Sequence, residues 1–171
     1  MPIRAFTLAD CGPTADLTNH YITTSAIHFG TEHVAPEYFE RLWTSTRARY
    51  PWLVATDDAG RYQGYAKAGV WRDRAAYDWT AEAGIYLVTE AQGQGRGTAL
   101  YRALLDDLRA RGFHSAIGGI TLPNEPSVRL HESLGFAHVG TVRRAGWKLD
   151  RWHDVGFWQL LLHDPTHRPG P

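Results

Sequence analysis

The sequence has a single cysteine, no long apolar run and no excess of either charge. Cys11 alone can form neither a disulfide within the chain nor a cluster of thiolate metal ligands. No apolar stretch approaches the roughly 20 residues that a membrane-spanning helix needs. The 18 lysines and arginines balance the 18 aspartates and glutamates, so the overall positive field typical of nucleic-acid-binding proteins is missing. These absences favour a cytoplasmic protein with a small-molecule partner.

The composition predicts one folded unit. The 171 residues are 43% hydrophobic and 21% charged, a balance typical of a globular domain with a buried core. We predict a single domain over residues 1–162 and a disordered tail over 163–171, where the sequence is HDPTHRPGP. The first ten residues, MPIRAFTLAD, lack the apolar core of a signal peptide.

Hydrophobic periodicity and turn residues predict an alternation of strands and helices. Strands are expected at 2–6, 52–56, 61–71, 77–88, 114–122, 136–148 and 152–162. Helices are expected at 8–27 with an interruption near Gly12 and Pro13, at 35–50 with Tyr38 and Leu42 on its buried face, through Leu100, Leu104 and Leu108 to Gly112, and at 125–134. Because strands cluster first and alternate with helices later, the sheet is predicted to be mixed, with βαβ character in its second half.

A glycine-rich segment separates an apolar run from an amphipathic helix in YLVTEAQGQGRGTALYRALLDDL, residues 86–108. A strand that enters a helix through such a loop presents free backbone N–H groups at the positive end of the helix dipole, where phosphate binds. The dinucleotide motif G-x-G-x-x-G fails because Thr98 stands in place of its third glycine. The ATP-binding motif fails because no lysine follows Gly97. A glycine-rich turn without a ligand is the plainer alternative.

Two motifs together resemble the coenzyme A site of the GNAT acetyltransferase superfamily. Gln92-x-x-Gly95-x-Gly97 at the start of a helix is similar to the superfamily's pyrophosphate loop. In PNEPSVRLHESLGF, Asn124 is followed seven positions later by His131, where most members have the tyrosine that protonates the departing thiolate. In having a histidine at this place, the segment PSVRLHE resembles the corresponding segment of the phosphinothricin N-acetyltransferase family.

The resemblance to that family extends over nearly the whole chain. Similar segments are NHYITTSAIHFGTE at 19–32, RYPWLVA at 49–55, AYDWTAE at 76–82, LYRALL at 100–105 and WHDVGFWQ at 152–159. The resemblance implies an α/β fold of the GNAT type, with a mixed, mostly antiparallel central sheet of about six to seven strands flanked by about four helices. It also implies a homodimer that uses acetyl-CoA as co-substrate and needs no metal.

The same resemblance implies which residues hold acetyl-CoA. Most lie at the end of the strand, in the glycine loop and in the first turn of the next helix, and two lie in the second motif. They are Tyr86, Leu87, Val88, Gln92, Gly93, Gln94, Gly95, Arg96, Gly97, Thr98, Ala99, Asn124 and Ser127. Backbone N–H groups around Leu87 and Val88 are the expected donors to the thioester oxygen.

Acetyl transfer from a thioester to an amine needs a base for the amine and an acid for the leaving thiolate. Glu82 is the candidate base, since Trp79 and small apolar neighbours in WTAEAGIYL would desolvate it and raise its pKa. An exposed strand carboxylate is the plainer alternative. His131 is the candidate acid because imidazole titrates near neutral pH. Its plainer alternative is a surface histidine on an amphipathic helix.

The resemblance also implies an acceptor with anionic or strongly polar ends. Family positions near the acceptor are Phe29, Arg72, Arg74, Tyr77, Gly119 and Thr121. Guanidinium groups bind such anions through two contacts at once. A solvated loop is the alternative for the two arginines. Arg72 stands where the family more often has lysine, and IGGIT at 117–121 replaces a more apolar run.

Three readings of the function remain open at this point. The first is an enzyme that acetylates the α-amine of phosphinothricin and thereby detoxifies this herbicide, or that acetylates methionine sulfoximine or methionine sulfone. The second is an acetyl-CoA-binding sensor without turnover, which would not need Glu82 and His131. The third is an acetyltransferase for aminoglycosides or protein N-termini, but a large cationic acceptor would need an acidic cleft that VWRDRAAYDW does not resemble.

Overall fold

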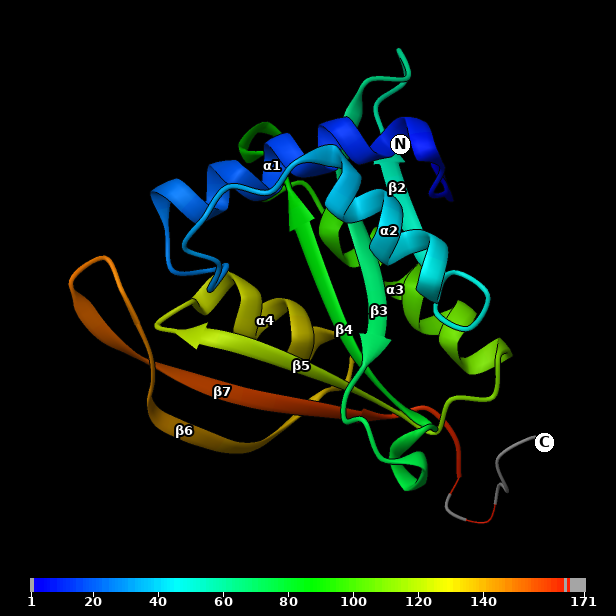
Figure 1. Cartoon of the computed structure of the whole chain (residues 1–171). Coiled ribbons are helices and arrows are strands. Elements are labelled where there is room, and N and C mark those ends of the chain that lie inside the picture. The colour runs from blue at the N-terminus through cyan, green and yellow to red at the C-terminus, as the bar shows by residue number, and fades with distance from the viewer. Residues whose placement is uncertain (1, 165, 167–171) are drawn as a thin grey trace.

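The computed structural model describes residues 2–164 and 166, and these residues contain one seven-stranded sheet (Figure 1). The strands are β1 (Ile3–Ala5), β2 (Trp52–Thr56), β3 (Tyr62–Val70), β4 (Thr80–Leu87), β5 (Ser115–Leu122), β6 (Ala137–Lys148) and β7 (Arg151–Leu161). Their order across the sheet is β1-β2-β3-β4-β5-β7-β6. Only β4 and β5 pair in parallel. The predicted mixed, mostly antiparallel sheet is therefore confirmed.

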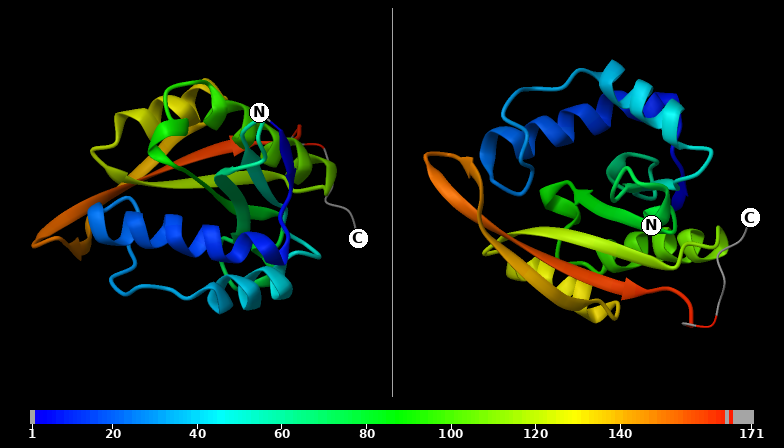
Figure 2. Two further views of the ribbon diagram at one scale, coloured as in Figure 1. Left: turned by 90° about the horizontal axis from the view of Figure 1, so that it is seen from above. Right: turned by 60° about the horizontal axis from the view of Figure 1, so that its bottom comes forward.

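Four α-helices cover the two faces of the sheet, as expected (Figure 2). They are α1 (Cys11–Thr24), α2 (Pro36–Thr46), α3 (Arg96–Ala110) and α4 (Glu125–Ser133). On one face, α1 and α2 pack on an aromatic cluster that contains Phe39, Trp52 and Tyr65. On the other face, α3 contributes Leu100, Leu104 and Leu108 to the larger core cluster. None of the helices among residues 2–164 is long and apolar enough to cross a bilayer.

The predicted interruption of the first helix at Gly12 and Pro13 is wrong. After a short 3-10 turn at Leu8–Asp10, α1 runs without a break from Cys11. Pro13 lies in the first turn, where a missing N–H costs no helical hydrogen bond. The predicted disordered tail falls largely on residues 165 and 167–171, which lie outside the described residues.

Two further predictions needed correction. The buried aromatic residue of α2 is Phe39, which is 2% exposed, whereas Tyr38 is 44% exposed. The strand expected from residue 77 begins at Thr80, because Ala75–Tyr77 form a 3-10 turn. The first error concerns which side chains of α2 its neighbours cover, and the second concerns where β4 begins.

The parallel pair β4 and β5 is joined over only three residues of each strand. Thr80–Glu82 pair with Ser115–Ile117, and beyond them the two strands separate. The chain leaves the free end of β4 through the glycine loop, forms α3 and returns as β5, which is the predicted βαβ unit. The sheet thus contains a fork that opens toward the glycine loop, with Glu82 at its base.

The β6–β7 hairpin extends beyond the rest of the sheet (Figures 1 and 2). β6 is an edge strand, and nearly all of its side chains are exposed. The exposed large hydrophobic residues of the hairpin are Val139, Val142, Trp147, Leu149, Trp152 and Leu161. This hairpin therefore presents an unusually apolar edge.

Candidate active site

The glycine loop has the backbone geometry of an anion site. Gly93 and Gly95 have φ values of +70° and +73°, a region that side chains rarely adopt, and a Cβ on either would meet no heavy atom within 4 Å. Gly95 is the N-cap of α3, and no side chain caps this end. The first N–H groups of α3 therefore have no acceptor within the helix and lie at the positive end of its dipole.

A cavity of about 510 Å³ lies between this loop, β4 and α4. Nine of the residues predicted to hold acetyl-CoA line it: Tyr86, Leu87, Gln92, Gly93, Gly95, Gly97, Thr98, Asn124 and Ser127. The Asn124 side chain caps α4 by accepting the Ser127 N–H at 3.2 Å. The two sequence motifs, about thirty residues apart, thus meet across one cavity.

Four of the predicted residues do not line that cavity. Val88 lines a different depression, and its N–H donates to the Gln63 carbonyl at 3.0 Å. The Gln94 amide donates to the Glu90 carbonyl at 2.7 Å, and Ala99 is exposed. This geometry leaves Leu87 as the better oxyanion donor of the predicted pair.

The fourth residue, Arg96, turns its side chain away from the cavity. Its Nη1 donates to Gln63 Oε1 at 2.9 Å, on the side where Glu90 also lies. Of the lysines and arginines in the described chain, only Arg129 of α4 lines the cavity. The sequence motif fixes the loop backbone, which includes the Arg96 N–H, and not the direction of the Arg96 side chain.

Tyr21 of α1 is a cavity residue that the sequence did not reveal. Its hydroxyl donates to the Leu87 carbonyl at 2.7 Å and accepts from the Gln92 amide at 2.9 Å. These bonds tie the end of β4 and the glycine loop to α1. No local pattern marks Tyr21, since it lies 71 residues before Gln92.

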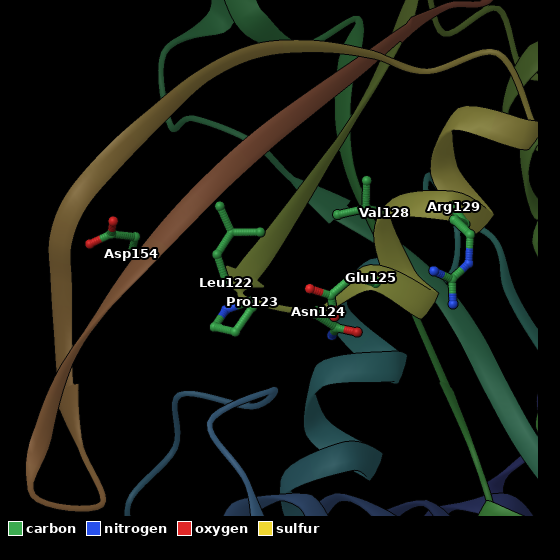
Figure 3. Close-up of a pocket in the computed structure, with 7 residues that line it drawn as sticks. All are labelled: Leu122, Pro123, Asn124, Glu125, Val128, Arg129 and Asp154. Carbon is green, nitrogen blue, oxygen red and sulfur yellow. The ribbon is translucent and has the colours of Figure 1, made fainter.

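A second cavity, of about 500 Å³, lies beside the N-terminus of α4 (Figure 3). Its lining residues are Leu122, Pro123, Asn124, Glu125, Val128, Arg129 and Asp154. Figure 3 shows Arg129 directed away from Leu122 and Asp154. With two carboxylates and no glycine loop, this cavity is a poorer match for phosphate than the first.

Glu82 lies on the sheet face that carries α1 and α2, and the residue is exposed there. A Cβ on Gly119 of β5 would lie 3.9 Å from Glu82 Oε1 and 3.4 Å from the Phe157 ring. Part of the side chain is exposed, yet partial burial raises its pKa, while Lys67 and Arg72 act in the opposite direction. Trp79, the expected neighbour, packs on Phe113 instead.

His131 lies on the opposite face of the sheet, buried to 4% exposure. Its Nδ1 donates to the Ser127 carbonyl at 2.8 Å, and its Nε2 lies 3.1 Å from the Tyr101 hydroxyl. Burial lowers the pKa of His131, and burial also raises the pKa of Tyr101 well above its ordinary value. The neutral ring with its proton on Nδ1 therefore presents Nε2 as an acceptor, and Nε2 and the Ala83 carbonyl both lie within reach of the single hydroxyl proton of Tyr101.

Two consecutive glycines of β5 separate the candidate base from the candidate acid. A Cβ on Gly118 would collide with His131 Nε2, and a Cβ on Gly119 would approach Glu82. The Tyr101 hydroxyl also lies 3.2 Å from the carbonyl of Ala83, the first residue of β4 after the segment that pairs with β5. The structure thus brings Glu82 and the His131–Tyr101 pair to the base of the fork from opposite faces.

The predicted acceptor residues lie on three different segments. The connection between β3 and β4 carries three of them, all exposed: Arg72, Arg74 and Tyr77. Of these three, Arg72 lowers the pKa of Glu82 through its positive charge. Phe29 lies against Gly146 and His153 of the β6–β7 hairpin. Thr121 is half-buried at the end of β5, two residues after Gly119.

No group of three or more histidine, cysteine or acidic side chains is arranged to hold a metal in the part of the chain that the structure describes. A helix N-terminus with free N–H groups, a strand fork, and the candidate base and acid are the features that remain. The model of the acetyltransferase (GNAT) domain family matches residues 3–156 of this chain. The chain belongs to the GNAT acetyltransferase family. The family predicted from the two motifs is thereby confirmed.

Relatives of this GNAT chain carry more specific names. It is 48% identical to a phosphinothricin N-acetyltransferase of Streptomyces viridochromogenes over 164 residues, which cover 96% of this chain and 89% of the relative. It is 42% identical to an L-methionine sulfoximine/L-methionine sulfone acetyltransferase of Pseudomonas aeruginosa over 126 residues, 72% of this chain and 73% of the relative.

A solved structure supports the cofactor assignment. The phosphinothricin acetyltransferase of Sinorhizobium meliloti, determined in complex with acetyl-CoA, superposes with a TM-score of 0.93. The two sequences are 32% identical, and the match covers 99% of this chain and 92% of the other. Acetyl-CoA is therefore the co-substrate expected in the cavity between the glycine loop and α4.

Proposed function

We propose that this GNAT chain transfers the acetyl group of acetyl-CoA to the α-amine of a small amino acid, with phosphinothricin as its main acceptor. The observation that carries the proposal is the position of Glu82. This carboxylate lies at the base of the β4–β5 fork, exposed on one face, while the cofactor cavity reaches the same strand from the glycine loop. The names of the relatives support phosphinothricin as the acceptor.

The first N–H groups of α3 bind the pyrophosphate of the co-substrate, and Arg129 adds a positive charge from α4. Ile85 and Leu87 line the way from the loop to the fork, and the Leu87 N–H donates to the thioester oxygen. Acetyl-CoA supplies the activated acyl group. Asn124 and Ser127 fix the start of α4 along this path.

Glu82 accepts the proton that the acceptor ammonium loses, either directly or through a water molecule. The amine nitrogen then bonds to the thioester carbon, the bond from that carbon to sulfur breaks, and the nitrogen loses its second proton to water. The Tyr101–His131 pair returns a proton to the thiolate from the other side of the fork. Acid and base are thus separate groups, which matches the requirement that both proton transfers occur in one turnover.

The acceptor binds on the face of Glu82, among Phe29, Arg72, Arg74, Tyr77, Gly119 and Thr121. Arg72 is near enough to influence Glu82, so it is suited to hold the anionic group of the acceptor side chain. Methionine sulfoximine and methionine sulfone are second candidates, favoured by the relative of Pseudomonas aeruginosa. Acetylation of phosphinothricin would remove its amine charge and detoxify it, giving herbicide resistance to a cell that contains this enzyme in its cytoplasm.

The exposed apolar hairpin supports a homodimer. β6 offers a free edge of 12 residues, and Val142, Trp147 and Trp152 are exposed on the hairpin. An open apolar edge is commonly covered by another copy of the same chain. We therefore propose that two copies meet at the β6–β7 hairpin.

A thiol-release assay with purified protein and acetyl-CoA tests the activity. Phosphinothricin, methionine sulfoximine, methionine sulfone and glutamate form the amino-acid panel, and an aminoglycoside and an N-terminal peptide represent the rival acceptors. We expect the highest kcat/KM for phosphinothricin, and second-rank values for the sulfoximine and sulfone. Release of coenzyme A only with the aminoglycoside or the peptide would contradict the proposed function.

A further inference from the structure

Lys67 of β3 is a charged residue beside Glu82 for which the reaction described above gives no role. Strand pairing places Lys67 opposite Gly84 and Gly69 opposite Glu82. Lys67 and Glu82 are therefore diagonal neighbours on one face, a relation in which Cα atoms lie roughly 7–8 Å apart. Each charged side chain faces a glycine on the adjacent strand.

The sheet surface between and around these two charges is bare backbone. A Cβ on Gly69 would meet no heavy atom within 4 Å, and a Cβ on Gly84 would meet only the Tyr86 ring, at 4.0 Å. Gly119 of β5, next to Glu82, likewise has no side chain to cover this surface. Three glycines on three neighbouring strands leave room for a small ligand that touches both Lys67 and Glu82.

The Lys67 ammonium is held in place but has unused donors. It lies 5.2 Å from the ring centroid of Trp52, and no hydrogen-bond acceptor for it occurs among the residues that the structure describes. Lys148, by contrast, donates to the His28 carbonyl at 2.6 Å. A half-buried ammonium with free N–H groups is stabilised by an anionic ligand.

The other charged groups around this surface also favour an anion. The positive charges of Lys67 and Lys148 both lower the pKa of His28. The positive charges of Lys67 and Arg72 both lower the pKa of Glu82, against the effect of its burial. Glu82 is the one anion in this set. The surface therefore suits a zwitterion with an additional negative group better than a cationic acceptor.

We propose that Lys67 binds the α-carboxylate of the acceptor amino acid while Glu82 faces its α-amine. A single carbon separates these two groups in an α-amino acid, which matches a cation and an anion placed diagonally on one sheet face. Arg72 is then left for the anionic group of the acceptor side chain. The inference rests on the proposed function, because it names the part of the acceptor that one residue recognises.

The test compares Lys67→Met, which removes the charge, with Lys67→Arg, which keeps it. Steady-state constants are measured for phosphinothricin and for its decarboxylated amine, which keeps the phosphinate but has no α-carboxylate. We expect Lys67→Met to raise the KM for phosphinothricin by about tenfold to a hundredfold. The KM values for the decarboxylated amine and for acetyl-CoA should stay unchanged, and Lys67→Arg should recover part of the loss.

An equal loss for both acceptors, together with a displaced acid limb of the pH–rate profile, would overturn the inference, because Lys67 would then act through the pKa of Glu82. A phosphinothricin KM within about twofold of wild type in Lys67→Met would overturn it as well, since a charged contact contributes more than that. An unchanged KM for acetyl-CoA shows that the variant is folded. A wild type that acetylates neither acceptor would overturn the proposed function, and this inference with it.

Discussion

At the residue scale, the hydrogen bonds of His131 determine how it can act. Its Nδ1 proton is committed to the Ser127 carbonyl, so its Nε2 faces Tyr101 as an acceptor in the neutral ring. The burial that lowers the pKa of His131 keeps the ring neutral near pH 7. The proton available at the fork is then the hydroxyl proton of Tyr101, and His131 can replace it only after its Nε2 has taken up a proton from solvent.

Replacing His131 by alanine should lower kcat by roughly 10²- to 10⁴-fold, the range typical of a general acid. The KM for acetyl-CoA should change little, because His131 does not line the cofactor cavity. Steady-state kinetics with phosphinothricin measure both constants. His131→Tyr should recover part of the rate, since a phenol can donate a proton from the same direction.

Tyr101→Phe is the matched variant for this prediction. If Tyr101 and His131 act as a pair, the double variant should be about as slow as either single one, because groups that act as a unit are not additive. A kcat for His131→Ala within about threefold of wild type would exclude the acid role, since that role contributes far more.

The sequence motifs named Glu82 and His131 but could not name their neighbours. The bond between Tyr101 and His131 joins residues 30 positions apart, and the Tyr101 side chain comes from the middle of α3. Lys67 becomes a neighbour of Glu82 only through the register of β3 on β4. Contacts of this kind depend on packing between elements, for which a single sequence has no periodic signal.

At the element scale, the N-terminus of α3 and the side of α4 form the two walls of the cofactor cavity. The glycine pattern predicted the first wall, because left-handed φ values at Gly93 and Gly95 are a local backbone property. Asn124 and Ser127 predicted the second wall. The sequence did not predict that Arg129 would be the cation on this wall. The Arg96 side chain lies outside the cavity, and Arg129, for which the motif predicted no role, lines it.

The two arginines give a matched pair of variants. Arg129→Ala should raise the KM for acetyl-CoA about tenfold, the equivalent of roughly 1.4 kcal/mol, because it removes a charge that faces phosphate groups. Arg96→Ala should change this KM by less, since the Arg96 side chain binds Gln63 outside the cavity. Initial rates at varied acetyl-CoA and saturating acceptor provide both numbers.

The reverse order of effects would show that Arg96 reorients when the co-substrate binds. The assignment of Arg129 would then be wrong. Unchanged KM values for phosphinothricin in both variants serve as the control, because neither residue is among those proposed to bind the acceptor.

Element boundaries were predictable where they depend on local chemistry. Gly112 ends α3 with a φ of +82°, and Gly60 closes the turn between β2 and β3 with a φ of +79°, both as glycine punctuation suggests. The fork between β4 and β5 was not predictable in detail. Beside it the Tyr101 hydroxyl contacts the Ala83 carbonyl and His131 lies against Gly118, and both are contacts between different elements.

At the scale of the whole molecule, the β6–β7 hairpin is the feature that one copy of the chain leaves unexplained. Trp147 and Trp152 lie 5.5 Å apart between ring centroids near its tip, and both are exposed. The alternation of the hairpin sequence predicted strands, but it could not predict that both would leave the body of the fold. A second copy would cover these rings.

Trp152→Lys should convert the proposed dimer into a monomer, because it places a charge in the exposed tryptophan pair near the tip of the hairpin. Sedimentation velocity at micromolar concentration measures the change. Leu161→Lys is the matched control, since Leu161 is 61% exposed against 56% for Trp152 but lies at the other end of β7. A wild type that sediments as a monomer would contradict the dimer, and dissociation only in Leu161→Lys would move the interface.

The central claim is that both faces of the sheet cooperate in one acetyl transfer, with Glu82 as the base. Glu82 must be ionised to accept the amine proton, and its raised pKa means that the ionised fraction begins to fall at a higher pH than for an ordinary glutamate, whose pKa is about 4.3. Activity should therefore be full above the raised pKa and decline as the pH drops through it.

The direct measurement is the pH–rate profile of acetyl transfer to phosphinothricin by wild type and Glu82→Gln. Wild type should form the α-N-acetyl product, and its pH–rate profile should have an acid limb above pH ~4.3. In Glu82→Gln this limb should be absent, and kcat should be lower by about 10²- to 10⁴-fold. Its KM for acetyl-CoA should stay the same. Equal kcat values and equal acid limbs for the two proteins would contradict the account, because a chain that transfers acetyl groups without Glu82 uses another base.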